Sequence, residues 1–189
     1  MPKQTLRQLM LARRKALSSA ERDAASHLAQ QQLMALSGFA AAGTVALYAA
    51  IHNEVETAEL FAAASAAGKI LLFPAVCGAN ITFRSVTGPE QLQRGRFGIP
   101  EPNADCPPAS PHDADLLVIP AVAYALNGQR IGYGKGFYDK ALHELEGAGK
   151  LVGLCYDFQL VDEIPGEPHD VCVDLIVTET RVVCPRYLS

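Results

Sequence analysis

Residues 116–139 read Leu-Leu-Val-Ile-Pro-Ala-Val-Ala-Tyr-Ala-Leu-Asn-Gly-Gln-Arg-Ile-Gly-Tyr-Gly-Lys-Gly-Phe-Tyr-Asp, and they indicate the fold class more clearly than any other stretch. The stretch begins with four consecutive apolar residues, Leu116–Ile119, a pattern typical of a strand buried on both faces. A glycine-rich loop follows, and the pattern after it predicts a helix from about Phe137 to Leu145. Strand, loop and helix in this order are typical of an α/β protein.

The segments around this stretch support the same class. Apolar residues at helical spacing predict a helix over 3–17, and the capping box formed by Ser18 and Glu21 predicts a second helix that ends near Gly38. A further helix is expected over 58–67, with Thr57 as its N-cap and Gly68 as its stop. Apolar or alternating runs predict strands at 44–48, 70–73 (stopped by Pro74), 81–86, 151–155 and 175–177.

The proline-rich segment 100–111 is expected to be a loop that crosses within one domain, because neither flank looks able to bury a core of its own. We therefore predict a single domain over 1–189, with a mostly parallel sheet, helices on both faces and an N-terminal helical pair.

Composition excludes several classes of protein. The chain has 189 residues, of which 49% are hydrophobic and 19% charged, and its formal net charge is −4. This apolar content excludes a disordered chain, and the slight acidity argues against nucleic acid as the main partner. The five cysteines are widely spaced, without a CxxC pair, which favours free thiols in a reducing compartment. Without a long apolar run or a secretory signal, we expect a cytoplasmic protein that does not enter membranes, and a monomer.

The glycine-rich loop carries the clearest chemical signal. Three alternating glycines (Gly132, Gly134 and Gly136) let backbone N–H groups converge on one point, and the predicted helix adds its free N–H groups. With the cations Arg130 and Lys135, the loop is suited to holding phosphates. The alternative is a glycine turn that merely lets segments pack closely. The spacing matches neither the Walker A loop nor the dinucleotide-binding motif.

Acidic and basic residues elsewhere fit a nucleotide site, but each also has a plainer interpretation. Asp139 is placed to bind Mg²⁺, or only to complement the dipole of the predicted helix. Lys3, Arg7 and Arg14 share one helix face, which would more often be a solvated stripe. Glu54 and Glu56 are expected on one side of an extended segment at the carboxyl end of a strand, where α/β proteins bind ligands, or else as surface acids. The pair 169–170, His-Asp, is either part of a site or a turn.

Taken in order, these motifs resemble the 5-formyltetrahydrofolate cyclo-ligase family, also called methenyltetrahydrofolate synthetase. The resemblance covers nearly the whole chain. It rests on Lys3-x-x-x-Arg7, Leu47-Tyr48, Glu54-Val-Glu-Thr57, Phe97-Gly-Ile-Pro-Glu-Pro102, Val118-Ile-Pro120, Gly128-x-Arg130-x-Gly-Tyr-Gly-x-Gly-Phe-Tyr-Asp139, Gln159, Ile164-Pro165, His169-Asp170 and Val177-Thr-Glu179.

The resemblance implies a fold and a reaction. The fold would be a three-layer α/β/α sandwich of the ribose-phosphate isomerase and CoA-transferase type. The reaction would be ATP- and Mg²⁺-dependent closure of 5-formyltetrahydrofolate to 5,10-methenyltetrahydrofolate, with release of ADP and phosphate. Transfer of the γ-phosphoryl group to the formyl oxygen would create a leaving group, and N10 would then attack the formyl carbon. Such transfer depends on positioning and on neutralising phosphate charge.

The resemblance also implies roles for individual residues. Catalysis would involve Arg130, Lys135 and Tyr138. ATP would be bound by Lys3, Arg7, Arg130, Ile131, Gly132, Tyr133, Gly134, Lys135, Gly136, Phe137 and Tyr138. The folate would contact Ile51, Glu56, Phe97, Tyr133 and Tyr138, with the carboxylate of Glu56 accepting from the pterin N–H groups. Mg²⁺ would be held by Asp139 and Asp170.

The chain departs from the family pattern at three places. Glu56 stands where members often have aspartate, Tyr124-Ala125 where they often have Phe-Asp, and Tyr133 where some have arginine. Two other functions stay open: a different small-molecule kinase or ligase on the same scaffold, and a catalytically silent nucleotide- or folate-binding module. The Glu56 and Phe97 segments argue against the first. The full set of phosphate-loop residues argues against the second.

Overall fold

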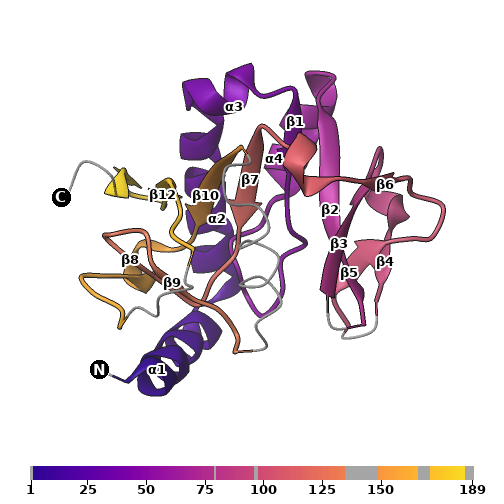
Figure 1. Cartoon of the computed structure of the whole chain (residues 1–189). Helices are drawn as coiled ribbons and strands as arrows, with labels where there is room; N and C mark the ends of the chain where they lie inside the picture. Colours follow the sequence, from indigo (N-terminus) through magenta and orange to yellow (C-terminus); the bar gives the residue numbers. More distant parts are fainter. Residues whose placement is uncertain (1, 79, 96–97, 135–148, 166–170, 186–189) are drawn as a thin grey trace.

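A computed structural model describes residues 2–78, 80–95, 98–134, 149–165 and 171–185. In this part of the chain a mostly parallel, eight-stranded sheet has the order β13-β12-β10-β7-β1-β2-β3-β6 (Figure 1). Parallel pairing joins β12 (Leu175–Val177), β10 (Lys150–Leu154), β7 (Leu116–Ile119), β1 (Thr44–Ala46) and β2 (Ile70–Cys77). Antiparallel strands β13 (Val182–Val183), β3 (Asn80–Ser85) and β6 (Pro108–Ala109) complete its edges.

The two faces of this sheet carry separate apolar clusters. Along the central strands alternate residues point to opposite faces, as the strand period of two requires: Val45 and Leu116 on one, Ala46 and Leu117 on the other. The helices α2 (Ser19–Met34), α3 (Ser37–Ala41) and α4 (Ala58–Ala66) pack on the first face. The predicted α/β class with N-terminal helices is therefore confirmed, whereas the helix expected over 137–145 lies outside the described residues.

A smaller sheet and the first helix form a separate layer beside the main sheet. Strands β11 (Leu160–Val161), β8 (Ala123–Ala125) and β9 (Arg130–Ile131) make up this sheet, in that order. The helix α1 (Lys3–Ala16) packs its apolar face on β8 and β9 and lies below the lower end of α2 in the view of Figure 1. Glycine 153 in β10 allows a close approach, because a Cβ there would lie 2.5 Å from the ring of Tyr124 in β8.

Several local predictions are confirmed. The capping box is present, since the Ser18 Oγ accepts from the Glu21 N–H and the Glu21 carboxylate accepts from the Ser18 N–H. Gly68 ends α4 with a φ of +70°. All four residues of β7 are buried, as its apolar run predicted.

Other local predictions are wrong. The second helix ends at Met34, and the separate helix α3 includes Gly38. Thr57 does not cap α4 with its side chain, because its hydroxyl donates to the Tyr48 carbonyl, 2.7 Å away. Strand β2 continues through Pro74. The ladder between β1 and β2 ends at Leu72, so among the described residues Pro74 has no ladder partner on that edge.

The segment 100–111 is also more regular than the predicted loop. It contains β5 (Pro100–Pro102), which pairs with β4 (Leu92–Arg94), and β6 at the edge of the main sheet. Short 3₁₀ turns at Pro89–Gln91, Pro111–Asp113 and Asp157–Gln159 complete the described elements. The described helices include none that is long and apolar enough to cross a membrane.

Candidate active site

The first helix and the glycine-rich loop are in direct contact. The loop begins at Gly132, directly after β9, and the Arg7 Nε of α1 donates to the Gly132 carbonyl at 2.9 Å. Gly134 has a φ of +91°, a conformation that L side chains rarely adopt. A Cβ at this position would lie 3.5 Å from the Arg7 guanidinium carbon. The structure thus brings together two segments that the sequence separates by more than a hundred residues.

Arg130 lies beneath the loop rather than on the surface. It belongs to β9, and its residue surface is 5% exposed. Its Nη1 would be 3.7 Å from a Cβ at Gly132, which places the guanidinium against the backbone of the loop. Ile131 is also buried and packs in the apolar cluster under α1. The buried strand β9 therefore anchors the loop and positions two of the predicted nucleotide-binding residues.

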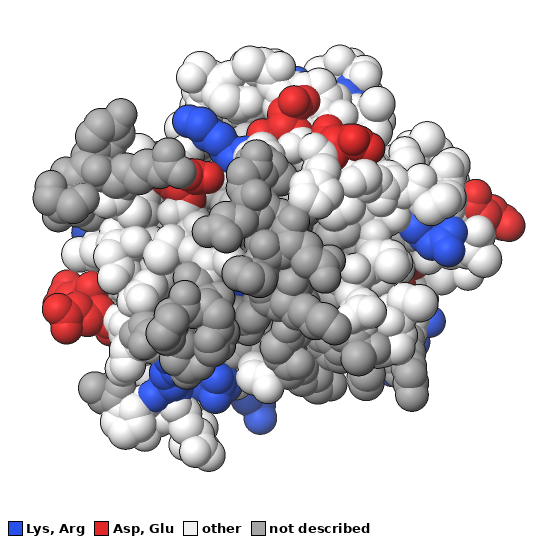
Figure 2. All heavy atoms as spheres, in the orientation of Figure 1, with Lys and Arg blue, Asp and Glu red and all other residues white. Residues whose placement is uncertain are grey.

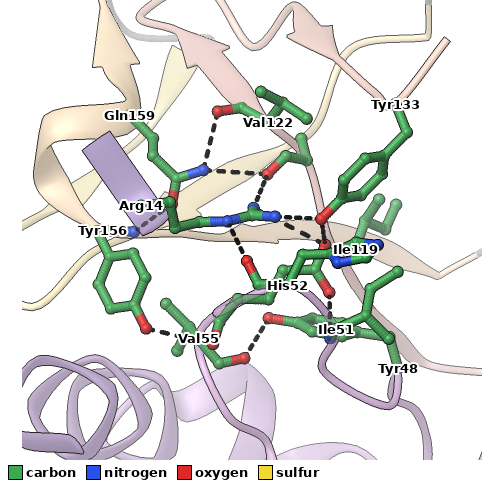
Figure 3. Close-up of polar contacts among 12 residues, drawn as sticks. Arg14, Tyr48, Ile51, His52, Val55, Ile119, Val122, Tyr133, Tyr156 and Gln159 are labelled. Atoms are coloured by element: carbon green, nitrogen blue, oxygen red, sulfur yellow. Dashed lines mark hydrogen bonds and ion pairs between the residues drawn. The ribbon is translucent and has the colours of Figure 1, made fainter. Parts of the chain in front are cut away.

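The side chain of Tyr133, in the glycine-rich loop, contacts the turn that follows β1. Its hydroxyl donates to the Glu54 Oε1 at 2.7 Å and accepts a hydrogen bond from the Arg14 Nη2 (Figure 3). The His52 ring lies 5.8 Å from the Tyr133 ring, centroid to centroid. Burial raises the pKa of Tyr133, and the charge of Glu54 raises it further. The phenol is therefore a neutral hydrogen-bonding group at physiological pH.

The position of Arg14 shows that the basic face predicted for the first helix is not solvated along its whole length. Its residue surface is 1% exposed, so it is neither a solvated side chain nor a free cation for phosphate. Its Nε donates to the His52 carbonyl at 2.8 Å, and its Nη1 lies 3.9 Å from the Glu54 Oε1. Elsewhere on α1, Lys3 and Arg7 are half-buried and Arg13 and Lys15 are exposed. Figure 2 shows Lys and Arg gathered where Figure 1 places this helix.

The two glutamates after β1 have different environments. Glu54 is 3% exposed, and its Oε2 accepts from the Ile51 N–H at 3.0 Å. Burial raises the pKa of Glu54, and the nearby Arg14 opposes that rise. Glu56 is exposed, and partial burial raises its pKa while Arg22 opposes the rise. Within the described ranges, no hydrogen bond or ion pair engages the Glu56 carboxylate. The structure thus joins Tyr133 to Glu54 and not to Glu56.

The turn that presents Glu54 has an unusual backbone. His52 and Asn53 both have positive φ, 50° and 59°, which is uncommon outside glycine. The Asn53 Nδ2 donates to the Arg14 carbonyl at 3.3 Å, so side-chain and backbone atoms of Arg14 both hold this turn. Residues 54–56 are not part of a strand, so the alternation that would place Glu54 and Glu56 on one side does not apply here.

Several predicted site residues lie outside the described ranges. They are Phe97, Lys135, Gly136, Phe137, Tyr138, Asp139 and Asp170. Among the residues that the structure describes, no group of three or more His, Cys, Asp or Glu side chains could hold a metal ion. Lys3 lies at the start of α1. Ala125, where the family often has an acid, is fully buried in the apolar cluster under α1.

Sequence reasoning did not anticipate the contact between Arg14, Glu54 and Tyr133. Each residue stood out for another reason: a shared helix face, the end of a strand and a glycine-rich loop. No spacing rule links three residues so far apart in the chain, so the signal for their contact exists only in three dimensions. The predicted helical position of Arg14 is confirmed, whereas the solvated face predicted for it is wrong.

Comparison with known structures shows which class of protein has this fold. The structure superposes on the NMR structure of 5,10-methenyltetrahydrofolate synthetase from Aquifex aeolicus with a TM-score of 0.88 and 37% identity, covering 98% of this chain and 94% of that one. A 5,10-methenyltetrahydrofolate synthetase from Mycoplasma pneumoniae gives a TM-score of 0.78 at 28% identity, with 95% and 99% covered. The fold is therefore that of methenyltetrahydrofolate synthetases.

The sequence comparisons identify the family. The sequence model of the 5-formyltetrahydrofolate cyclo-ligase family matches residues 1–179. The 5-formyltetrahydrofolate cyclo-ligase of Escherichia coli K12 is 30% identical over 175 residues, which are 90% of this chain and 96% of that protein. The Mycolicibacterium smegmatis enzyme of the same name is 38% identical over 94 residues, about half of each chain (49% and 48%). This chain belongs to the 5-formyltetrahydrofolate cyclo-ligase family, and the predicted family and ligase class are confirmed.

Proposed function

We propose that this protein closes 5-formyltetrahydrofolate to 5,10-methenyltetrahydrofolate at the expense of ATP, releasing ADP and phosphate. The formyl oxygen attacks the γ-phosphorus and the bond to ADP breaks, which leaves an iminium phosphate. N10 then bonds to the formyl carbon and loses its proton to the surrounding water, and the C–O bond breaks to release phosphate. Both steps depend on holding the reacting atoms close together and on neutralising phosphate charge.

The contact between Arg7 and the glycine loop is the observation that carries the nucleotide part of this proposal. Arg7 and the loop are the two segments that family resemblance assigns to ATP, and the hydrogen bond from Arg7 to Gly132 joins them. We assign Lys3, Arg7 and the segment 130–138 to ATP binding, and Arg130, Lys135 and Tyr138 to phosphoryl transfer. Gly134 has a positive φ and no Cβ, so phosphate oxygens could approach the backbone N–H groups of this turn closely.

The folate is proposed to bind between the loop and the turn after β1. Ile51 and Tyr133 flank the Glu54 carboxylate in the structure, which supports their assignment to the folate pocket. Phe97 and Tyr138 are proposed to complete it. Glu56 keeps its proposed role as the acceptor of pterin N–H groups, because its carboxylate has no partner among the described residues. Glu54 is the second candidate, because it contacts Tyr133 directly.

Magnesium is the proposed cofactor, with Asp139 and Asp170 as its protein ligands. Two carboxylates match the hard oxygen donors that Mg²⁺ prefers when it also binds phosphate. The ion would supply positive charge to the phosphate oxygens during transfer. Chelation of Mg²⁺ is expected to abolish turnover, and Asp139→Asn should lower turnover by orders of magnitude in a protein that still folds.

We also propose the wider setting of the enzyme. It would act as one domain over 1–189 and as a monomer in the cytoplasm, on folate with or without a polyglutamate tail, and without nucleic acid or membrane partners. The helix expected over 137–145 would add the second helical layer of a three-layer sandwich of the ribose-phosphate isomerase and CoA-transferase type. The apolar clusters are connected, which supports a single domain: Tyr124 of β8 lies in a cluster of the main sheet, and Phe158 packs against both the other main-sheet cluster and the cluster under α1.

A direct assay tests the proposed function. Purified protein, Mg²⁺, ATP and 5-formyltetrahydrofolate should give the methenyl chromophore, with one ADP and one phosphate for each product and no product without ATP. No ATP-dependent product at high enzyme concentration would overturn the proposal. ATP consumption without the chromophore would instead indicate another kinase or ligase, and binding of both compounds without turnover a silent binding module.

A paired substitution decides between the two glutamates. Whichever of Glu54→Gln and Glu56→Gln removes the pterin acceptor should raise the KM for 5-formyltetrahydrofolate by about tenfold or more, as expected for a lost hydrogen bond to a charged group. Glu56→Gln is the deciding variant, because an unchanged KM there would assign the acceptor to Glu54. Glu54→Gln alone does not decide, since it also alters the contacts of Glu54 with Arg14 and Tyr133.

A further inference from the structure

The guanidinium of Arg14 connects helix α1 to three other parts of the chain: the turn 52–54, Ala121 and Tyr133 (Figure 3). Its Nε donates to the His52 carbonyl at 2.8 Å, and its Nη1 donates to the Ala121 carbonyl at 3.5 Å. Its Nη2 donates to the Tyr133 hydroxyl, and Nη1 lies 3.9 Å from the Glu54 Oε1. Arg14 and Glu54 have side chains that are 1% and 4% exposed, so these contacts form away from water. Buried charges are stable only when they are paired and bonded in this way.

These contacts fix the side chain of Tyr133. Its hydroxyl accepts from Arg14 and donates to Glu54, so both the position of its oxygen and the direction of its proton are set. The Arg14 guanidinium also lies over the Tyr133 ring, 5.5 Å from its centroid. Because Tyr133 stands between Gly132 and Gly134, holding its side chain also holds the loop, whose glycines would otherwise leave it free to move.

The same guanidinium influences the charge of Glu54. Burial raises the pKa of Glu54, and Arg14 lowers it, as do the hydrogen bonds from Ile51 and Tyr133. Other titratable groups that interact with Glu54 are Glu56, which raises its pKa, and Tyr48 and Tyr133, whose ionisation Glu54 opposes. Removal of the Arg14 charge therefore favours the protonated, neutral form of Glu54.

We propose that Arg14 is a positioning residue for the cyclo-ligase reaction, because its buried guanidinium holds the Tyr133 phenol and the Glu54 carboxylate together and so forms the folate side of the site before substrate binds. The inference rests on the proposed function, which assigns Tyr133 to the folate pocket. An arginine is needed here because its planar fork of donors reaches several acceptors at fixed angles, whereas a lysine offers one compact charge.

The first experiment compares Arg14→Lys with its neighbour Arg13→Lys, which alters an exposed arginine of the same helix. Arg14→Lys should raise the KM for 5-formyltetrahydrofolate by about tenfold, a loss typical of charge-assisted hydrogen bonds. The KM for ATP should rise by less, because Arg14 reaches the loop only through Tyr133. Calorimetry without ATP should show the same weakening of folate binding. Arg13→Lys should leave all three quantities within about twofold. Equal folate binding by wild type and a folded Arg14→Lys protein would overturn the proposal.

A double-mutant cycle separates positioning from general stability. Tyr133→Phe removes the hydroxyl that Arg14 and Glu54 share, so adding Arg14→Lys to it should weaken folate binding by much less than Arg14→Lys does in the wild type. A residue that merely stabilised the fold would give additive effects, and additivity would contradict the proposal. Thermal unfolding of all four proteins shows which part of each effect is stability.

The pH profile provides a readout that a purely structural residue would not change. In Arg14→Met, the acidic limb of kcat/KM for 5-formyltetrahydrofolate should move to higher pH, because Glu54 loses the charge that favours its ionised form. Should this variant not fold, Arg14→Met combined with Glu54→Gln removes both buried charges, and this protein should show no such limb. An unshifted limb in folded Arg14→Met would overturn the proposal. A wild type that lacks ATP-dependent turnover would refute the proposed function itself, whereas an active wild type with normal Arg14 variants refutes the positioning role alone.

Discussion

The Nε of Arg7 donates a hydrogen bond of 2.9 Å to the carbonyl oxygen of Gly132. This bond connects the first helix to the glycine-rich loop across 125 positions of sequence. It uses one donor of a guanidinium that has five, so the remaining donors can bind phosphate oxygens beside the loop. Helix α1 and the glycine-rich loop therefore form two sides of the proposed nucleotide site.

Replacement of Arg7 should weaken the use of ATP above all. Arg7→Met removes a cation and the bond to the loop, so the KM for ATP should rise by about tenfold or more, with a smaller change in the KM for 5-formyltetrahydrofolate. Steady-state rates with each substrate varied in turn provide the test. Arg13→Met is the matched control, since this exposed arginine of the same helix has its guanidinium over the Phe158 ring. An unchanged KM for ATP would remove Arg7 from the nucleotide site.

Alanine at Gly134 should disturb the loop through its backbone. The φ of +91° strains any L side chain, at a cost of about 1–2 kcal/mol, so Gly134→Ala should lower both turnover and the free energy of unfolding. Gly38→Ala is the opposite case, because a Cβ there meets nothing within 4 Å inside α3, and it should stabilise the protein by about 0.5 kcal/mol. Chemical denaturation of both variants measures the difference, and equal stabilities would contradict the strain argument.

The turn at Asn53 should tolerate glycine better than alanine. Asn53→Ala places a residue without a local hydrogen bond at a φ of 59° and should lose about 1–2 kcal/mol of stability. Asn53→Gly also loses the bond to the Arg14 carbonyl but relieves the backbone, so it should be the more stable of the two. Thermal unfolding compares the variants directly. An alanine variant as stable as the glycine variant would show that the turn relaxes.

Glu54 should make the protein less stable as pH rises through the weakly acidic range. Because its pKa is higher in the folded than in the unfolded protein, the folded state binds more protons above the ordinary carboxyl pKa of 4.5. Stability from this group is complete below pH 4.5 and is lost as pH rises through the folded pKa. Subtraction of the Glu54→Gln stability curve from that of the wild type should leave a component that falls with pH. A component that rises would contradict the assigned direction.

Asp157 should show the opposite dependence on pH. Burial acts to raise the pKa of Asp157, but hydrogen bonds from Arg181, Thr180 and Thr178 outweigh it and lower the pKa below the ordinary value of 3.8. Its contribution is therefore present above pH 3.8 and lost as pH falls through the folded pKa. Asp157→Asn should cost less than about 1 kcal/mol at neutral pH, since the pair is partly exposed, and nothing in strong acid. Equal losses at both pH values would contradict this assignment.

The sequence predicted local structure correctly where residues close together in the chain determine it. The apolar run at Leu116–Ile119 predicted a strand buried on both faces. The spacing of Ser18 and Glu21 predicted where α2 begins, and the structure shows the reciprocal bonds of the capping box there. The wrong predictions depended on neighbours. Pro74 remains inside β2, where one edge has no ladder partner among the described residues, and the hydroxyl of Thr57 turns to the Tyr48 carbonyl instead of capping α4.

The sequence by itself determined the α/β class, the cyclo-ligase family and the glycine loop, because each is written in residues close together or in an ordered set of motifs. The tertiary structure decided that Arg14 is buried, that Glu54 and not Glu56 bonds to Tyr133, and that Arg7 meets the loop. Periodicity places a side chain on a face of its own helix or strand, but what covers that face depends on packing between distant segments. Burial and charge pairing are properties of those contacts, and for that reason three dimensions were needed to assign them.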